Sequence, residues 1–299
     1  MRSHIYLMLG EKSLQQVRKV VVIGAGTMGR GIAQVVAQAG CTVTLTDLSR
    51  DLLDGAVKGI REALEGGVER GKVTEEERDR ALHLIGTSTE METSVADVDL
   101  VIEAVPENAD LKAGIFSALD KACDERTILA SNTSSLSVTE LARVTSRASK
   151  VVGMHFFNPV HIMKLVELIV PEATSEETVD AARGLVEAMG KTAIVVTDSP
   201  GFASSRLGVV LGLEAMRMLE QEVASAEDID RAMELGYKHP MGPLRLTDLV
   251  GLDVRLAIAE HLYDTLGGQQ YRPPEILRRL VKEGKLGRKS GEGFYRWEE

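Results

Sequence analysis

A short apolar run followed by three closely spaced glycines constrains the fold of this chain more than any other feature. Residues 18–23 (RKVVVI) have the β-branched composition of a buried parallel strand. The glycine-rich segment 24–29 (GAGTMG) follows at once, and residues 30–39 then have the composition of a helix. A glycine-rich turn between a strand and a helix is typical of a dinucleotide-binding βαβ unit, whereas an isolated glycine hexamer is weak evidence.

The glycines of this turn have separate physical roles. Gly24 allows the tight turn, Gly26 lets the backbone approach a pyrophosphate, and Gly29 lets the helix pack closely on the strand. The helix N-terminus also presents free N–H groups to the anion. The sequence therefore predicts cofactor contacts from Gly24, Ala25, Gly26, Thr27, Met28 and Gly29. The alternative is a domain that merely turns tightly here.

An acidic residue after the second expected strand indicates which dinucleotide binds. Asp47 follows the strand at residues 41–45 and lies about 20 residues beyond Gly29, where a carboxylate accepts a hydrogen bond from a ribose 2′-OH. The same carboxylate repels a 2′-phosphate, so we expect NAD rather than NADP, although the nearby Arg50 argues the other way. A flavin would use a similar turn, but the sequence shows no other flavoprotein feature.

The remaining pattern divides the chain into two domains. Strand candidates at 100–104, 127–130 and 151–155 alternate with helices, and further strands are expected at 164–170 and 193–196. This alternation predicts an α/β, Rossmann-like, doubly wound and mostly parallel sheet. The apolar runs typical of strands end at the turn sequence DSPG (198–201). Beyond it, apolar residues recur at the spacing of a helix. We therefore expect an N-terminal tail (1–17), an NAD-binding domain (18–197) and an all-α C-terminal domain (198–299).

Composition excludes several classes of protein. The chain has 299 residues, of which 44% are hydrophobic, and its net charge of −10 makes general nucleic-acid binding a poor fit. It has no run of 18 apolar residues, so we expect no membrane helix, and the opening segment does not read as a signal peptide. Two cysteines, Cys41 and Cys123, are too few for a disulfide scaffold or a metal framework. We expect buried thiols, no metal and a cytoplasmic location.

One of the six histidines lies where the chemistry of a dehydrogenase needs a base. Hydride transfer from an alcohol requires a group that takes the hydroxyl proton near neutral pH. His155 ends the strand at 151–155, at the sheet edge where ligands of such folds bind. Glu167 lies inside the apolar segment KLVELIV and needs a partner if it is buried, so the returning strand could place it beside His155. The alternatives are a structural histidine and a glutamate that faces water on an edge strand.

A polar loop follows the strand at 127–130. Its sequence, SNTSSL (131–136), offers hydroxyl and amide groups that could hold a substrate oxygen or a nicotinamide. The alternative is an ordinary N-cap cluster for a helix that begins near Val138.

Together these segments resemble the NAD-dependent L-3-hydroxyacyl-CoA dehydrogenases, which include 3-hydroxybutyryl-CoA dehydrogenases. The resemblance runs in order from about residue 18 to residue 295 through VVIGAGTMGRGIAQVVAQAG, VIEAVPEN, ILASNTSSL, GMHFFNPVHIMKLVELI, DSPGF, DIDRAMELGYKHPMGPLRLTDLVGLD and GRKSGEGFY. It implies an acyl-CoA thioester substrate and a helical C-terminal domain that closes on the substrate and forms a homodimer.

The resemblance also implies roles for individual residues. His155 would be the catalytic base, and Glu167 would orient it. Ser134 and Asn158 would contact both substrate and nicotinamide. The remaining cofactor contacts would come from Glu107, Lys112 and Lys289.

One position departs from the family pattern. The family often has PGFxxNR after the domain junction, with the asparagine near the substrate carbonyl, but this chain has Ser205 there. A hydroxyl still donates one hydrogen bond, so we expect Ser205 to perform this task. The change also leaves open a free hydroxy-acid or sugar-acid dehydrogenase, such as an L-gulonate dehydrogenase of the crystallin-like branch. A non-catalytic NAD-binding structural protein is a third reading, but it should lack the His155–Glu167 pair.

The helix after Asp47 carries basic residues that could bind the phosphates of CoA. The candidates are Lys58, Arg61 and Arg70. Acidic residues are interspersed with them, so a solvated, salt-bridged helix face is an equally good interpretation.

Overall fold

The computed structural model describes residues 17–298, and within this range the chain forms two compact units that meet after Asp198. Of the expected tail at 1–17, residues 1–16 lie outside the described residues. Val17, the last residue of that tail, is buried in the core of the first unit. Cys41 and Cys123 are both buried free thiols, as predicted, and burial raises the pKa of Cys123 to about 11.

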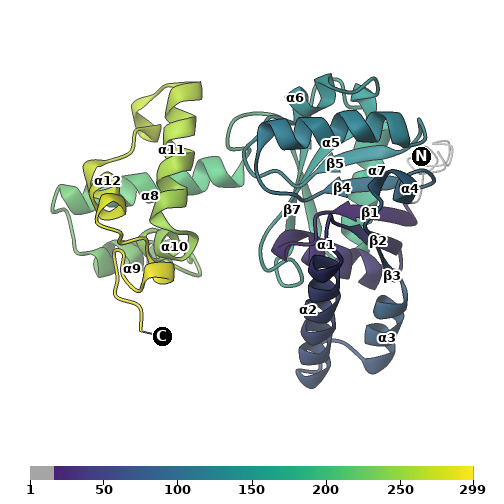
Figure 1. The fold of residues 1–299 in the computed structure, drawn as a ribbon. Helices are drawn as coiled ribbons and strands as arrows, with labels where there is room; N and C mark the ends of the chain where they lie inside the picture. Colours follow the sequence, from purple (N-terminus) through teal and green to yellow (C-terminus); the bar gives the residue numbers. More distant parts are fainter. Residues whose placement is uncertain (1–16, 299) are drawn as a thin grey trace, which may run out of the picture. The chain divides into compact units, whose positions relative to one another are not determined.

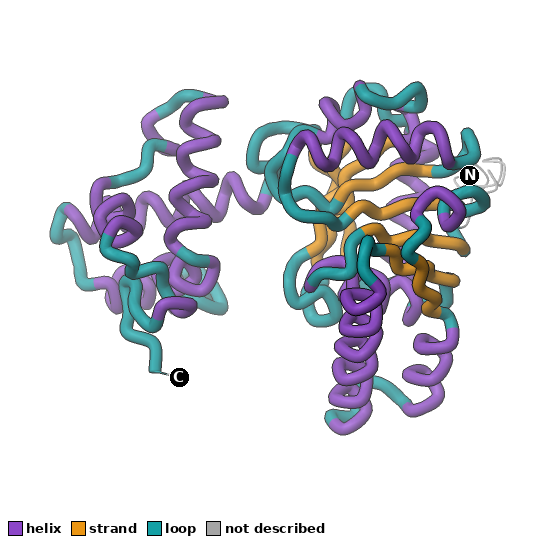
Figure 2. The backbone as a smooth tube through the Cα atoms, viewed as in Figure 1, coloured by secondary structure: helices purple, strands orange, loops and turns teal. Residues whose placement is uncertain are grey.

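Residues 17–198 contain one sheet of eight strands in the order β3-β2-β1-β4-β5-β6-β7-β8 (Figures 1 and 2). All neighbouring strands pair in parallel except β6 and β7, so the predicted doubly wound, mostly parallel sheet is confirmed. The strands are β1 (Lys19–Ile23), β2 (Thr42–Thr46), β3 (Ile85–Ser88), β4 (Leu100–Glu103), β5 (Ile128–Ser131), β6 (Val151–Phe156), β7 (Leu165–Val170) and β8 (Thr192–Thr197).

Helices cover both faces of this sheet, which is why its central strands are apolar throughout. Figure 1 shows α1 on one side and α5 and α6 on the other. The largest apolar cluster of the unit joins alternate residues of the strands, such as Val20 and Val22, to α1, α2 and α7. The helices are α1 (Thr27–Gln38), α2 (Arg50–Glu69), α3 (Glu75–His83), α4 (Met91–Ser94), α5 (Ala109–Ala122), α6 (Val138–Arg143) and α7 (Glu176–Ala188).

Local signals in the sequence explain several helix ends. A capping box begins α3, where Thr74 Oγ1 accepts a bond from Glu77 N and Glu77 Oε2 accepts one from Thr74 N. The short edge strand β3 was not predicted, because its sequence IGTS has no apolar run to mark it.

Residues 199–298 form the second unit, and its elements in the described range are all helical, as predicted. They are α8 (Ser204–Glu220), α9 (Ala226–Gly236), α10 (Pro243–Val250), α11 (Leu252–Leu266) and α12 (Glu275–Lys282), with short 3-10 turns at Gln269–Tyr271 and Arg288–Ser290. Helix α10 begins at Pro243 because proline suits the first turn of a helix.

Two buried carboxylates fix the C-terminal segment of this unit. Asp248 accepts bonds from the backbone N–H groups of Phe294 and Tyr295 and from Trp297 Nε1, each at 2.9 Å. Asp230 accepts a bond from the Tyr295 hydroxyl at 2.7 Å. These contacts hold the segment that carries Lys289.

Candidate functional site

The carboxyl ends of four parallel strands bring together loops that are far apart in the sequence. The glycine-rich turn follows β1, residues 104–108 follow β4, residues 132–137 follow β5, and His155 lies near the end of β6. Strands β1 to β3 extend the sheet in one direction and strands β4 to β8 extend it in the other, so the strand order reverses between the parallel neighbours β1 and β4. Ligands of open α/β sheets bind at such a reversal point.

The backbone around the glycine-rich turn has the shape that the sequence predicts. Gly24 has φ +103°, and a Cβ atom there would lie 2.7 Å from the carbonyl oxygen of Ala104. A Cβ on Gly29 would lie 1.7 Å from the carbonyl oxygen of Gly24, whereas one on Gly26 would meet nothing within 4 Å. The outer glycines therefore serve packing, and Gly26 leaves space beside the first turn of α1. This space fits a pyrophosphate.

Asp47 lies against this turn. Its Oδ2 accepts a hydrogen bond from Ala25 N at 2.7 Å, and its Oδ1 accepts one from Leu48 N at 2.7 Å. A carboxylate oxygen has a second lone pair, so each can also accept a bond from a ribose hydroxyl. Arg50, the nearby basic residue, donates to Thr87 Oγ1 on β3 at 3.0 Å. This contact directs its guanidinium to an edge of the sheet.

His155 and Glu167 are direct neighbours across the antiparallel pair β6–β7. They occupy opposite positions in the register, and Nδ1 of His155 lies 2.8 Å from Oε2 of Glu167. The glutamate is fully buried, and the histidine side chain is 9% exposed. The alternative of a water-facing edge residue is wrong for Glu167, because β7 lies between β6 and β8. An ionised carboxylate only accepts hydrogen bonds, so this contact assigns the proton to Nδ1 and leaves Nε2 as the basic nitrogen.

An aromatic ring lines one side of the histidine. The ring of Phe157 lies 4.5 Å from the His155 ring, at an interplanar angle of 47°. The amide of Asn132, in the loop after β5, accepts a hydrogen bond from Phe156 N at 2.9 Å and so ties that loop to the end of β6.

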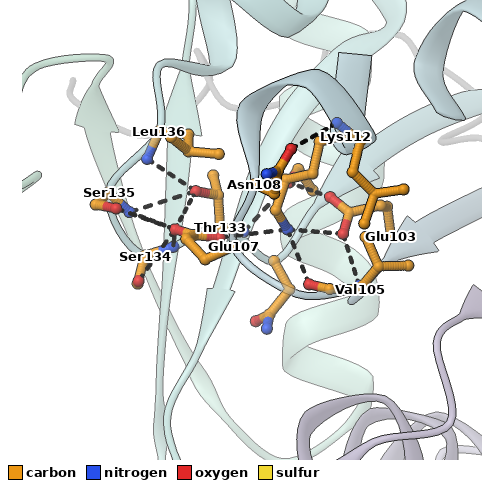
Figure 3. Close-up of polar contacts among 12 residues, drawn as sticks. Glu103, Val105, Glu107, Asn108, Lys112, Thr133, Ser134, Ser135 and Leu136 are labelled. Atoms are coloured by element: carbon orange, nitrogen blue, oxygen red, sulfur yellow. Dashed lines mark hydrogen bonds and ion pairs between the residues drawn. The ribbon is translucent and has the colours of Figure 1, made fainter. Parts of the chain in front are cut away.

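Glu107 organises the polar loop that carries Ser134 (Figure 3). Its Oε1 accepts bonds from Thr133 Oγ1 at 2.7 Å, from the N–H groups of Ser134 and Ser135 at 2.8 and 3.0 Å, and from both serine hydroxyls at 3.1 Å. Burial acts to raise the pKa of this carboxyl group, but these hydrogen bonds and the charge of Lys112 outweigh it. The pKa of Glu107 is therefore lowered.

Lys112 is buried behind this loop. Its ammonium lies 2.7 Å from Oε1 of Glu103 and 3.3 Å from Oε2 of Glu107, and its side chain is 1% exposed. Glu103 was not predicted as a site residue, although its sequence context carries a signal. Glu103 ends an apolar strand, and the argument that a buried acid needs a partner, which identified Glu167, applies equally to it.

The remaining predicted site residues lie outside the His155–Glu167 pair and the Glu107 loop. Asn158 is exposed in the turn after β6, and Ser205 is partly exposed in the first turn of α8. The ammonium of Lys289 lies 2.6 Å from the carboxylate of Asp253 in the second unit. On α2, Lys58 is 78% exposed and lies 3.9 Å from Glu62, which is the geometry of a solvated surface pair. Arg70 caps the end of the same helix.

Comparison with known proteins identifies the family. The model of the 3-hydroxyacyl-CoA dehydrogenase NAD-binding domain matches residues 19–199, and that of the 3-hydroxyacyl-CoA dehydrogenase C-terminal domain matches residues 201–297. The chain belongs to the 3-hydroxyacyl-CoA dehydrogenase family. It is therefore an NAD-dependent oxidoreductase, and the resemblance seen in its sequence is confirmed.

Individual relatives match along almost the whole chain. A probable 3-hydroxybutyryl-CoA dehydrogenase of Bacillus subtilis is 47% identical over 95% of this chain and 99% of its own length. Human mitochondrial hydroxyacyl-coenzyme A dehydrogenase is 44% identical over 94% of this chain and 91% of its own. The crystal structure of (S)-3-hydroxybutyryl-CoA dehydrogenase from Ralstonia eutropha is 43% identical, with a TM-score of 0.91 over 95% of this chain and 100% of that one.

The described residues offer neither a membrane-spanning helix nor a cluster of metal ligands. No helix in residues 17–298 is long and apolar enough to cross a membrane. Nor does that part of the chain bring together three or more His, Cys, Asp or Glu side chains in a geometry that would hold a metal ion.

Proposed function

We propose that this enzyme interconverts a short-chain L-3-hydroxyacyl-CoA and its 3-ketoacyl-CoA, with 3-hydroxybutyryl-CoA and acetoacetyl-CoA as the substrate pair. The observation that carries this proposal is the buried His155–Glu167 pair at the sheet edge that also bears the glycine-rich turn. The similar proteins from Bacillus subtilis and Ralstonia eutropha are named 3-hydroxybutyryl-CoA dehydrogenases, which supports the choice of a four-carbon acyl group.

The proposed mechanism assigns the proton to the histidine. During oxidation, Nε2 of His155 takes the C3 hydroxyl proton while C3 loses a hydride, so the alcohol becomes a ketone and the ring becomes an imidazolium. Glu167 accepts the Nδ1–H bond at 2.8 Å, which fixes the tautomer and stabilises the positive ring. In the reverse direction, the imidazolium returns the proton to the forming alkoxide. NAD, when bound, supplies the hydride acceptor, and NADH the donor.

Other residues of this chain would position the reactants. The backbone at Gly26 and the first turn of α1 would hold the pyrophosphate, and Asp47 would hold the ribose. We assign contacts with substrate or cofactor to a further set: Ser134, Asn158, Ser205, Glu107 and Lys289. Lys112 was also predicted to line the cofactor site, but its side chain is 1% exposed, so we propose that it acts there through Glu107. Lys58, Arg61 and Arg70 remain candidates for the phosphates of CoA.

We also propose a cytoplasmic homodimer formed through the helical unit. Leu246, Leu249 and Val250 project from one side of α10, and each is 37–40% exposed. We call these three residues the α10 stripe. An exposed apolar stripe of this kind is typical of a subunit interface. Two free, buried thiols fit a reducing compartment.

The experiment that tests the proposed function is NADH-dependent turnover of 3-ketoacyl-CoA thioesters from four to sixteen carbons, beside free hydroxy acids with NAD. We expect the highest kcat/KM with acetoacetyl-CoA. Faster turnover of a free hydroxy acid would favour the sugar-acid dehydrogenase alternative. Absence of turnover with every substrate would favour a non-catalytic NAD-binding protein.

A further inference from the structure

A buried carboxylate behind the cofactor loops has no role in the mechanism described so far. Glu103 is the last residue of β4 and is fully buried. Its register neighbours are Ile23 on β1, just before the glycine-rich turn, and Ser131 on β5, just before the loop that carries Ser134. This one side chain therefore lies between the two loops that a dinucleotide would contact.

Glu103 uses both carboxylate oxygens to join three segments. Oε2 accepts a bond from Ser131 Oγ at 2.6 Å. Oε1 accepts bonds from Val105 N and from Lys112 Nζ, both at 2.7 Å. The ends of β4 and β5 and the first turn of α5 are thus held by a single group.

The contacts continue from Glu103 to the polar loop through one buried cation (Figure 3). Lys112 links Glu103 to Glu107 Oε2 at 3.3 Å, and Oε1 of Glu107 accepts the N–H groups of Ser134 and Ser135. A buried ammonium between two carboxylates has few alternative positions, because leaving either one costs a strong charge-assisted bond. The position of Ser134 is therefore coupled to the charge on Glu103.

We propose that Glu103 is a positioning residue of the cofactor site. It acts through Lys112 and Glu107 to set the conformation of residues 133–135, and directly through Ser131 to set the start of that loop. Glu103 does not contact the reacting atoms, so its effect is on geometry. The turnover part of this proposal rests on the proposed function, whereas its effect on the loop does not.

The test compares three variants of the full-length enzyme. Glu103→Gln keeps the size of the side chain and removes its charge. Glu103→Gln/Lys112→Met removes both fully buried charges, so that neither is left without its partner, while Glu107 keeps its hydrogen bonds to residues 133–135. Asp120→Asn is the matched control, because Asp120 pairs with Arg147 at 2.8 Å near the other end of the same helix, α5.

We expect both Glu103 variants to lower kcat/KM for NADH by about 10–10²-fold, since small displacements of positioning groups have effects of this size. The Kd for NADH, measured by fluorescence, should rise several-fold. Hydrogen exchange of the Ser134 and Ser135 amides should become faster in both. The Tm of the double variant should lie closer to that of wild type than the Tm of Glu103→Gln does. The kcat/KM of the double variant should nevertheless stay low. Asp120→Asn should lower Tm and leave kcat/KM, Kd and exchange in this loop unchanged.

Two results would overturn the proposal. One is wild-type kcat/KM, Kd and loop exchange in the double variant. The other is an equal loss of kcat/KM in Asp120→Asn at matched Tm, since Glu103 would then act only through stability. If the wild-type enzyme did not turn over acetoacetyl-CoA, the proposed function would fail, while NADH binding and exchange would still decide the role of Glu103.

Discussion

Gly26 and Gly29 look alike in the sequence but differ in what surrounds them. Gly29 is closed in by the carbonyl oxygen of Gly24, whereas Gly26 faces open space and has φ −67°, a value that any residue adopts. Packing requires a glycine at position 29, whereas Gly26 leaves open space toward the expected pyrophosphate. The two roles can therefore be separated by experiment.

We predict that Gly26→Ala folds normally but binds NADH weakly. Its free energy of unfolding should stay within about 1 kcal/mol of wild type, because the added methyl group meets no protein atom. The added methyl group should keep the pyrophosphate from approaching the backbone closely, which costs about one charge-assisted hydrogen bond. The Kd for NADH, measured by fluorescence titration, should therefore rise about 10–10²-fold. Gly29→Ala should instead lose about 1–3 kcal/mol or more of stability. Equal NADH affinity in Gly26→Ala and wild type would contradict this account.

The sequence indicated the His155–Glu167 pair because both signals were local. His155 ends a strand, and Glu167 is an acid in an apolar run. Their direct pairing depends on the antiparallel register of β6 and β7, which the chain reaches only after folding. Glu107 and Lys112 were predicted only as cofactor contacts through the family resemblance. Their network with Glu103 was not predicted, because its members come from a strand end, a helix and a loop. Only the parallel pairing of β4 with β5 brings Ser131 to the same place.

Between elements, the conformation of the loop after β5 (132–137) depends on the charge of Glu107, which lies in the loop after β4. Glu107 accepts its hydrogen bonds as a carboxylate, and its pKa lies below the usual value of 4.5. A carboxyl group whose pKa is lower in the folded protein than in the unfolded chain stabilises the fold at pH values above its unfolded-state pKa. This contribution is lost as the pH falls through the folded pKa.

We therefore predict that the Tm difference between wild type and Glu107→Gln depends on pH. The wild type should be the more stable protein near neutral pH, and the difference should shrink as the pH falls below about 4.5. Calorimetry from pH 7 to pH 3 measures this directly. A difference that stays constant over that range would mean that the charge of Glu107 does not stabilise the loop.

Secondary structure was predicted well where hydrophobic patterns are strong, and poorly where an element is short. The buried central strands and the long helices of both units were anticipated from their apolar runs and periodicity. β3 has four residues with mixed polarity, and α10 follows a proline break, so both depend on neighbours for their existence. The sequence of a short edge strand or a short helix contains too few apolar residues to form a recognisable periodic pattern.

At the scale of the whole molecule, the α10 stripe is an exposed apolar surface that a monomer would leave in water. Analytical ultracentrifugation of the full chain should give a mass of twice 32.4 kDa. Leu246→Glu/Leu249→Glu should raise the dimer dissociation constant at least about tenfold, because a two-fold interface places each charge in it twice. Val195→Glu is the control, since Val195 is 50% exposed on β8 in the other unit. A wild-type mass of 32.4 kDa would contradict the proposed dimer.

The central claim is that His155, held by Glu167, moves the proton of the C3 hydroxyl group. The most direct measurement is NADH-dependent reduction of acetoacetyl-CoA by the wild type, His155→Ala and Glu167→Gln, each checked for NADH affinity and Tm. We predict that kcat falls by about 10²–10⁴-fold in His155→Ala and by a smaller factor in Glu167→Gln, with NADH affinity nearly unchanged. A His155→Ala enzyme that is stable, binds NADH and retains kcat within a few-fold of wild type would contradict the account.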